Sequence, residues 1–383
     1  MSVTAPLGFR AAGVAAGIKP SGSPDVAVVI NDGPSAAAAG VFTSNRVKAA
    51  PVRWSQQVLT GGQVQAVVLN SGGANACTGP DGYADARQTA EHMGRLLSVP
   101  ASQIAVCSTG LIGERLAMHR LLLGVDAATA SASAAGGRAA AGAIMTTDTV
   151  AKTCAARGSG YQIGGMAKGA AMLAPALATM LVVLTTDADL PASDLDKALR
   201  GSVRTTFDRL DTDGCMSTND TVLLLASGAS GVRPDLAEFT DLLTAACDDL
   251  ARQLQLDAEG ATKAIAINVV GAACEDDAVE AGRAIARCNL FKCAITGEDP
   301  NWGRVLAAVG TTGAAFEPDQ VSVAINGVWV CRNGASGTDR SAVDLRPRDV
   351  TVTVDLAAGQ DTATVLTTDL TAAYVHENSA YST

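Results

Sequence analysis

One threonine, Thr179, stands where it could become a nucleophile without help from a histidine. It follows a run of small residues that ends in Ala178, and it precedes the apolar run 180–184. If the bond between Ala178 and Thr179 were cut, Thr179 would carry both a hydroxyl group and a free α-amine. An α-amine has an ordinary pKa of about 8 and can accept the hydroxyl proton. Threonine is also common at the edge of buried strands, and the pattern alone favours that structural explanation.

The sequence lacks the common signatures of metal and cofactor chemistry. Three histidines (His92, His119 and His376) are few for a zinc hydrolase. The glycine-rich run 158–164 has one residue too many for a dinucleotide loop, and the run 211–214 places its glycine too early for a calcium-binding loop. There is no nucleophile elbow, Walker loop or HExxH pair. We therefore expect no metal and no organic cofactor.

The elements that must position Thr179 alternate between strands and helices. The run 180–184 is continuously apolar, as in a strand buried on both faces, and leucines at helical spacing predict a long amphipathic helix near residue 245. The predicted elements are strands at 26–30, 67–70, 104–107, 180–184 and 350–354, helices at 84–97 and 236–254, and a hairpin at 321–330. Mixed elements without a repeat or a long linker indicate interlocked α/β layers, with a domain boundary that could lie near 187–192.

Composition restricts the class of protein. A length of 383 residues predicts about two or three domains, and 48% apolar residues exclude global disorder. A net charge of −10 argues against a nucleic-acid partner. The apolar run 170–184 contains Pro175 and is shorter than the roughly 20 residues of a membrane span. Nine cysteines without a CxxC pair indicate free thiols. Because the N-terminus also lacks the order of a secretory signal, we expect a soluble, cytoplasmic protein.

The stretch 165–181, GMAKGAAMLAPALATML, resembles the self-cleavage motif of the ornithine acetyltransferase family of arginine biosynthesis. Further blocks that resemble the family follow one another along most of the chain, which makes the resemblance very specific. They lie at 71–79, 108–113, 144–149, 213–220, 259–263, 297–304 and 378–383.

The resemblance implies that the chain cuts itself before Thr179. The α chain, 1–178, and the β chain, 179–383, would interlock in one catalytic unit. Thr179 would take the acetyl group of N2-acetyl-L-ornithine, release ornithine, and pass the acetyl group to L-glutamate; acetyl-CoA could serve as a further donor. Each step forms an oxyanion, and the oxyanion hole of the family falls on Thr109 and Gly110. The family also implies a heterotetramer of two α and two β chains.

The substrate contacts that the resemblance implies are spread from residue 146 to the C-terminus. Lys168 could pair with the α-carboxylate that both substrates carry, and Glu259 could face the side-chain ammonium of ornithine or place the leaving amine. The C-terminal contacts would have to dock over the site, because a chain end otherwise frays. The full set is Thr146 or Thr147, Lys168, Thr179, Glu259, Asn378 and Thr383.

The resemblance also implies the fold, which is α/β of the α+β type. We expect a layered α-β-β-α sandwich, as in ornithine acetyltransferases and self-cleaving aminopeptidases, with a second, smaller α/β domain. Two other functions stay open. One is a self-cleaving amidohydrolase or aminopeptidase in which water removes the acyl group, and the other is a non-enzymatic relative that only binds an amino acid. Primary arginine biosynthesis and a role in secondary metabolism also stay open. Ala171 stands where the family commonly has glycine, which could slow the cleavage.

Overall fold

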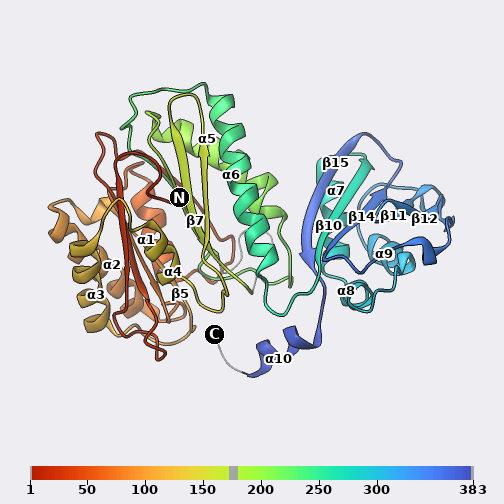
Figure 1. Cartoon of the computed structure of the whole chain (residues 1–383), viewed down its shortest axis with the longest axis horizontal. Helices are drawn as coiled ribbons and strands as arrows, with labels where there is room; N and C mark the ends of the chain where they lie inside the picture. The colour runs from red at the N-terminus through yellow and green to blue at the C-terminus, as the bar shows by residue number, and fades with distance from the viewer. Residues whose placement is uncertain (1, 172–179, 381–383) are drawn as a thin grey trace.

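The computed structural model describes residues 2–171 and 180–380, and these form three β-sheets (Figure 1). The first sheet has the order β1-β2-β4-β5, and every residue of β2, β4 and β5 is buried. A strand that is covered on both faces needs apolar residues at successive positions, and the run of valines in β2 and β4 supplies them. The bounds are β1 Phe9–Val14, β2 Val26–Asn31, β4 Ala66–Ser71 and β5 Ile104–Thr109.

The second sheet faces the first and has the order β3-β9-β8-β7-β6. Alternate side chains of β8 point in opposite directions: Leu181 and Val183 join the core of the first sheet, and Val182 and Leu184 pack toward the outer helices. The bounds are β3 Ala38–Phe42, β6 Lys152–Arg157, β7 Gln162–Lys168, β8 Leu181–Thr186 and β9 Thr221–Ala226.

Helices cover the outer faces of this pair of sheets (Figure 1). The first sheet is covered by α2 and α3, and the second by α5 and α6. Two further helices close the sides of the sandwich, because α1 contacts β5 and β3, and α4 contacts β1 and β7. The bounds are α1 Ala50–Leu59, α2 Gly79–Leu97, α3 Met118–Ser131, α4 Gly137–Ala143, α5 Ala192–Thr205 and α6 Leu236–Leu256, with 3-10 turns at Ala101–Gln103 and Phe207–Arg209. The expected α-β-β-α sandwich is confirmed.

The third sheet forms a smaller unit with a core of its own, which confirms the expected second domain (Figure 1). Its order is β13-β12-β11-β14-β10-β15. Beyond β15, α10 runs back toward the sandwich (Figure 1). The bounds are β10 Ala264–Ala272, β11 Ser322–Ile325, β12 Val328–Arg332, β13 Ala335–Ser336, β14 Asp349–Asp355, β15 Asp361–Thr368, α7 Glu275–Ala286, α8 Asn289–Thr296, α9 Trp302–Val309 and α10 Ala372–Ala380, with 3-10 turns at Pro318–Gln320 and Arg340–Ala342.

The change from the sandwich to the third sheet lies between α6 and β10, not near 187–192. Residues 187–192 join β8 to α5, and both elements belong to the sandwich. The physical reason is that β8 and β9 are parallel neighbours. Parallel neighbours need a crossover connection, and the segment that contains α5 supplies it, so the chain cannot leave the unit at that point.

Candidate functional site

A pocket of about 470 Å³, counted with the space that opens to solvent, lies where loops of both sandwich sheets meet. It brings together residues from six separate sequence blocks that resemble the family. Its lining consists of Ala74, Thr109, Gly110, Ile112, Thr146, Thr147, Lys168, Ala171, Ser217, Asn219 and Glu259. Every described residue that we expected at the site lines this pocket, except Asn378, which contacts it through Glu259.

Three expected site residues, Ala178, Thr179 and Thr383, lie outside the described residues. The described chain resumes at Met180, whose N–H donates a hydrogen bond to Asp220 Oδ1 at 3.0 Å. Leu181, the first residue of β8, pairs with Lys168, the last residue of β7. The strand that follows the expected nucleophile therefore begins beside Lys168.

The expected oxyanion residues lie at the end of β5, where backbone segments approach one another closely. Gly73 N–H donates to Thr109 O at 3.0 Å. Gly110 has a φ of 126°, and a Cβ at this position would lie 2.5 Å from Gly73 N. Both the left-handed backbone and the lack of space require glycine here. The segment after Thr109 is thus held open to the pocket without a side chain.

Lys168 carries its ammonium group into the buried wall of the pocket. It is 1% exposed, and its Nζ donates to Thr109 Oγ1 at 3.2 Å. Burial lowers the pKa of Lys168, and the nearby Asp148 carboxylate opposes this effect. The cation therefore lies directly beside the expected oxyanion segment.

Asp148 links the segment that carries Thr146 to the end of β7. Its Oδ2 accepts a hydrogen bond from Thr146 N at 2.9 Å, and its Oδ1 accepts one from Gly169 N at 2.7 Å. Lys152 Nζ lies 2.6 Å from Asp148 Oδ1 and 2.5 Å from Asp257 Oδ2. Burial acts to raise the pKa of Asp148. The charges of Lys168 and Lys152, together with hydrogen bonds from Lys152 and from Gly169 N–H, outweigh this effect and bring the pKa to about 2. Asp148 is therefore a carboxylate inside the fold.

Glu259 closes the pocket from the side of the third sheet. Its backbone N–H donates to Ala170 O at 2.9 Å, and its Oε2 accepts a hydrogen bond from Asn378 Nδ2 at 3.0 Å. This contact brings Asn378 beside a pocket residue, and its role as a substrate contact stays a prediction. A Cβ at Gly260 would lie 2.3 Å from Tyr374 N, so glycine at this position lets α10 pack against the segment that carries Glu259.

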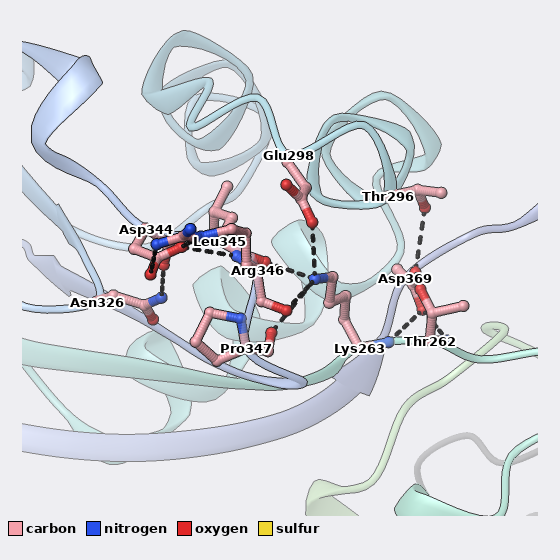
Figure 2. Close-up of polar contacts among 10 residues, drawn as sticks. All are labelled: Thr262, Lys263, Thr296, Glu298, Asn326, Asp344, Leu345, Arg346, Pro347 and Asp369. Carbon is pink, nitrogen blue, oxygen red and sulfur yellow. Dashed lines mark hydrogen bonds and ion pairs between the residues drawn. The ribbon is translucent and has the colours of Figure 1, made fainter.

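A polar cluster at the edge of the third sheet fixes the segment 259–263 (Figure 2). Lys263 Nζ points at Glu298 Oε1, at 3.3 Å, and donates to the backbone carbonyls of residues 345–347. Asp369 accepts hydrogen bonds from the N–H groups of Thr262 and Lys263, both at 2.9 Å. Because Asp369 lies just before α10, the same cluster holds both Glu259 and the helix that carries Asn378.

Two residues of the pocket and one residue that supports it were not predicted from the sequence. Ser217 and Asn219 lie in the block 213–220, which carried the resemblance but received no role. Asp148 likewise lies in the block 144–149, between expected substrate contacts. The type of residue alone could not have found them, because their importance depends on contacts with segments far away in the sequence.

The described residues offer neither a metal centre nor a membrane anchor of the helical kind. Within 2–171 and 180–380, no three His, Cys, Asp or Glu side chains are grouped so that they could hold a metal ion. Over the same residues, no helix combines the length and the apolar character that crossing a membrane requires.

Comparison with known sequences and structures gives a consistent result. A sequence model of the ArgJ family matches residues 10–383. An arginine biosynthesis bifunctional protein ArgJ from Thermobifida fusca is 72% identical over 383 residues and is covered along 100% of both chains. The protein of the same name from Streptomyces avermitilis is 67% identical over 382 residues, again with 100% of both chains covered. A solved ornithine acetyltransferase from Mycobacterium tuberculosis, complexed with ornithine, is 59% identical over 45% of this chain and 94% of that chain, with a TM-score of 0.45.

Proposed function

The chain belongs to the ArgJ family, and from this premise we propose that it is a glutamate N-acetyltransferase of arginine biosynthesis. The resemblance to ornithine acetyltransferases is thereby confirmed. The enzyme is an acyltransferase that moves the acetyl group of N2-acetyl-L-ornithine to L-glutamate. The observation that carries the assignment to this site is the convergence of Thr109, Gly110, Lys168 and Glu259 in one pocket beside the start of β8.

Thr179 is the nucleophile of the proposed mechanism. Its hydroxyl oxygen attacks the acetyl carbonyl of N-acetylornithine while its α-amine, released by self-cleavage, takes the hydroxyl proton. The bond from the acetyl carbon to the ornithine nitrogen then breaks, and the amine returns the proton to that nitrogen. Ornithine leaves, and acetyl-Thr179 remains. Glutamate repeats the sequence in reverse through its own amine, which restores the free hydroxyl.

The described pocket residues bind the substrates and stabilise the oxyanion in the proposed mechanism. Lys168 pairs with the α-carboxylate of either substrate, since a buried ammonium forms a strong charge-assisted hydrogen bond with a carboxylate. Thr109 and Gly110 stabilise the oxyanion. Glu259, held by Asn378, faces the ornithine side chain or the leaving amine. Thr146 and Thr147 both line the pocket, and Asp148 holds the backbone of Thr146.

The division of the chain follows from the same mechanism. Cleavage before Thr179 gives an α chain, 1–178, and a β chain, 179–383. The second sheet would then take β3, β6 and β7 from the α chain and β8 and β9 from the β chain. Its pairing of β7 with β8 and of β3 with β9 supports the proposal that the two chains stay together after the cut. An (αβ)2 heterotetramer in the cytoplasm is part of this proposal.

The decisive assay measures release of ornithine from N-acetylornithine with and without glutamate. A transferase releases ornithine continuously only when glutamate is present, because the acetyl-enzyme otherwise accumulates. Continuous release without glutamate would instead identify a hydrolase with water as the acceptor, and no release would favour a protein that only binds amino acids. Incubation of glutamate with acetyl-CoA alone tests the proposed second donor, and N-acetylglutamate is the expected product.

A further inference from the structure

The proposed site takes its parts from two different sheets. The nucleophile precedes β8 of the second sheet, and the oxyanion segment 108–110 ends β5 of the first sheet. A shift of one sheet against the other would change the distance between them, and a misplacement of about 1 Å can cost about 100-fold in rate. The two residues just before β9, Asn219 and Asp220, contact the oxyanion segment and Met180, which directly precedes β8.

Asn219 makes the contacts with the first sheet and its adjoining loops. Its Nδ2 donates to Ala74 O at 2.6 Å and to Ser108 O at 2.8 Å. Ser108 immediately precedes the oxyanion residues, and Ala74 N–H donates to Leu111 O at 2.9 Å, on their far side. The side-chain amide of Asn219, a residue that is 3% exposed, therefore fixes the position of the segment around Thr109 and Gly110.

Asp220, the next residue, contacts the residue that precedes β8 of the second sheet. Its Oδ1 accepts the hydrogen bond from Met180 N at 3.0 Å, and Thr221 N–H donates to Met180 O at 3.1 Å. Met180 is bonded covalently to Thr179, so these two contacts fix the backbone unit that follows the nucleophile. Asp220 is itself completely buried.

We propose that Asn219 and Asp220 are positioning residues that set the distance between the oxyanion segment and the start of the nucleophile strand. The proposal rests on the function proposed above. Asn219 holds the oxyanion segment and Asp220 holds Met180. Because these two residues are consecutive, a single peptide unit connects the two sets of contacts. Neither side chain needs to touch a reacting atom for this task.

The test compares Asn219→Ala with a matched variant of Asn31, a residue of β2 whose side chain contacts the other end of β9. Asn31 is also a buried asparagine that joins the two sheets, because its Nδ2 donates to Ala226 O at 3.2 Å and to Ser35 O at 2.9 Å. We expect Asn219→Ala and Asn31→Ala to lower the melting temperature to a similar extent. Only Asn219→Ala should lower kcat for acetyl transfer, by about 10–100-fold, with little change in KM.

Asp220 supplies a second, independent comparison. Burial raises the pKa of Asp220 well above its ordinary value, which favours the neutral carboxyl form, and an amide has the same shape. Asp220→Asn keeps an oxygen that can accept the Met180 hydrogen bond, whereas Asp220→Ala does not. We therefore expect Asp220→Asn to retain most of the wild-type kcat and Asp220→Ala to lose about 10-fold or more.

The outcomes separate this inference from the proposed function. Wild-type protein that transfers no acetyl group would defeat the function before any variant is compared. With active wild type, an equal kcat for Asn219→Ala and Asn31→Ala would overturn the inference alone. So would an effect of Asn219→Ala on KM alone, which would mean direct contact with substrate, or an equal loss in both Asp220 variants. If Asn219→Ala fails to fold, the Asp220 pair still decides.

Discussion

At the scale of single residues, the site depends on a buried cation that is placed before any substrate arrives. Lys168 ends β7, is 1% exposed and contacts Thr109 Oγ1. A buried ammonium is costly unless compensating charges surround it, and Asp148 supplies one of them. The fold therefore places the ammonium group of Lys168 beside the oxyanion segment, where the proposed function needs it.

Removal of the Lys168 charge should weaken the binding of both substrates. Replacement of Lys168 by Met should raise KM for N-acetylornithine and for glutamate about 10–100-fold, because each loses a charge-assisted hydrogen bond. Steady-state kinetics with each substrate varied in turn measures this effect. Lys197→Met, at an exposed position on the outer helix α5, is the matched control and should leave both KM values unchanged. Unchanged KM values in Lys168→Met would contradict the assigned role.

At the scale of elements, buried ion pairs and loop clusters hold the site together across long stretches of sequence. The Asp148–Lys152–Asp257 group links the loop after α4, strand β6 and the end of α6. The Lys263 and Asp369 cluster does the same for the segment 259–263 and α10 (Figure 2). The first group holds Thr146 and the second holds the segment that carries Glu259, so a disturbance in either should move residues that line the pocket.

Asp148 gives a prediction on stability and pH. Its pKa falls from an ordinary value of 3.8 to about 2 in the fold, so its carboxylate contributes stability above pH 4 and loses it as the pH falls toward 2. A shift of this size corresponds to about 2 kcal/mol. Asp148→Asn should therefore lower the free energy of unfolding at pH 7 by about 2 kcal/mol. Urea unfolding of both proteins from pH 7 down to pH 3 should show the difference shrinking below pH 4.

Asp344→Asn is the control for that experiment. The pKa of Asp344 is also lowered to about 2, by hydrogen bonds from Arg346, but this pair lies in solvent. Solvent screens exposed ion pairs, so the loss of stability should be smaller than for Asp148→Asn. A difference between wild type and Asp148→Asn that stays constant with pH would exclude the ionised carboxylate as its source.

The sequence predicted most elements but not the way in which they connect. The strand at 180–184 was predictable because a strand buried on both faces needs an unbroken apolar run. The hairpin was predictable because Asn326 and Gly327 both adopt positive φ, 47° and 80°, as the two-residue turn requires. The boundary expected near 187–192 was wrong, since the parallel pairing of β8 with β9 leaves no mark in the residues between them.

The candidate site was predictable where a resemblance named its residues, and only there. Lys168 and Glu259 were found in this way and do line one pocket. The residues that support the pocket could not be predicted from the sequence. Asn219, for example, has its role because it donates hydrogen bonds to the carbonyl groups of residues 74 and 108, and only folding brings these groups near it. Buried polar clamps of this kind have no characteristic spacing in sequence.

At the scale of the whole molecule, one sheet is shared between the two halves of the chain. The strands on either side of the expected cut, β7 and β8, are antiparallel neighbours with six paired positions, from Ile163↔Thr186 to Lys168↔Leu181. The hydrogen bonds of this ladder do not depend on the peptide bond before Thr179. Self-cleavage can therefore free the α-amine of the nucleophile while the fold and the pocket remain intact.

The central claim is that the chain makes its own nucleophile and carries the acetyl group on it. The most direct measurement is the intact mass of the denatured protein after incubation with N-acetylornithine, for the wild type and for Thr179→Ala. We predict two wild-type chains that meet between Ala178 and Thr179, with one acetyl group on the β chain that disappears when glutamate is added. Thr179→Ala should stay uncut and unacetylated. An uncut wild type, or a cut β chain that never gains the acetyl group, would contradict the account.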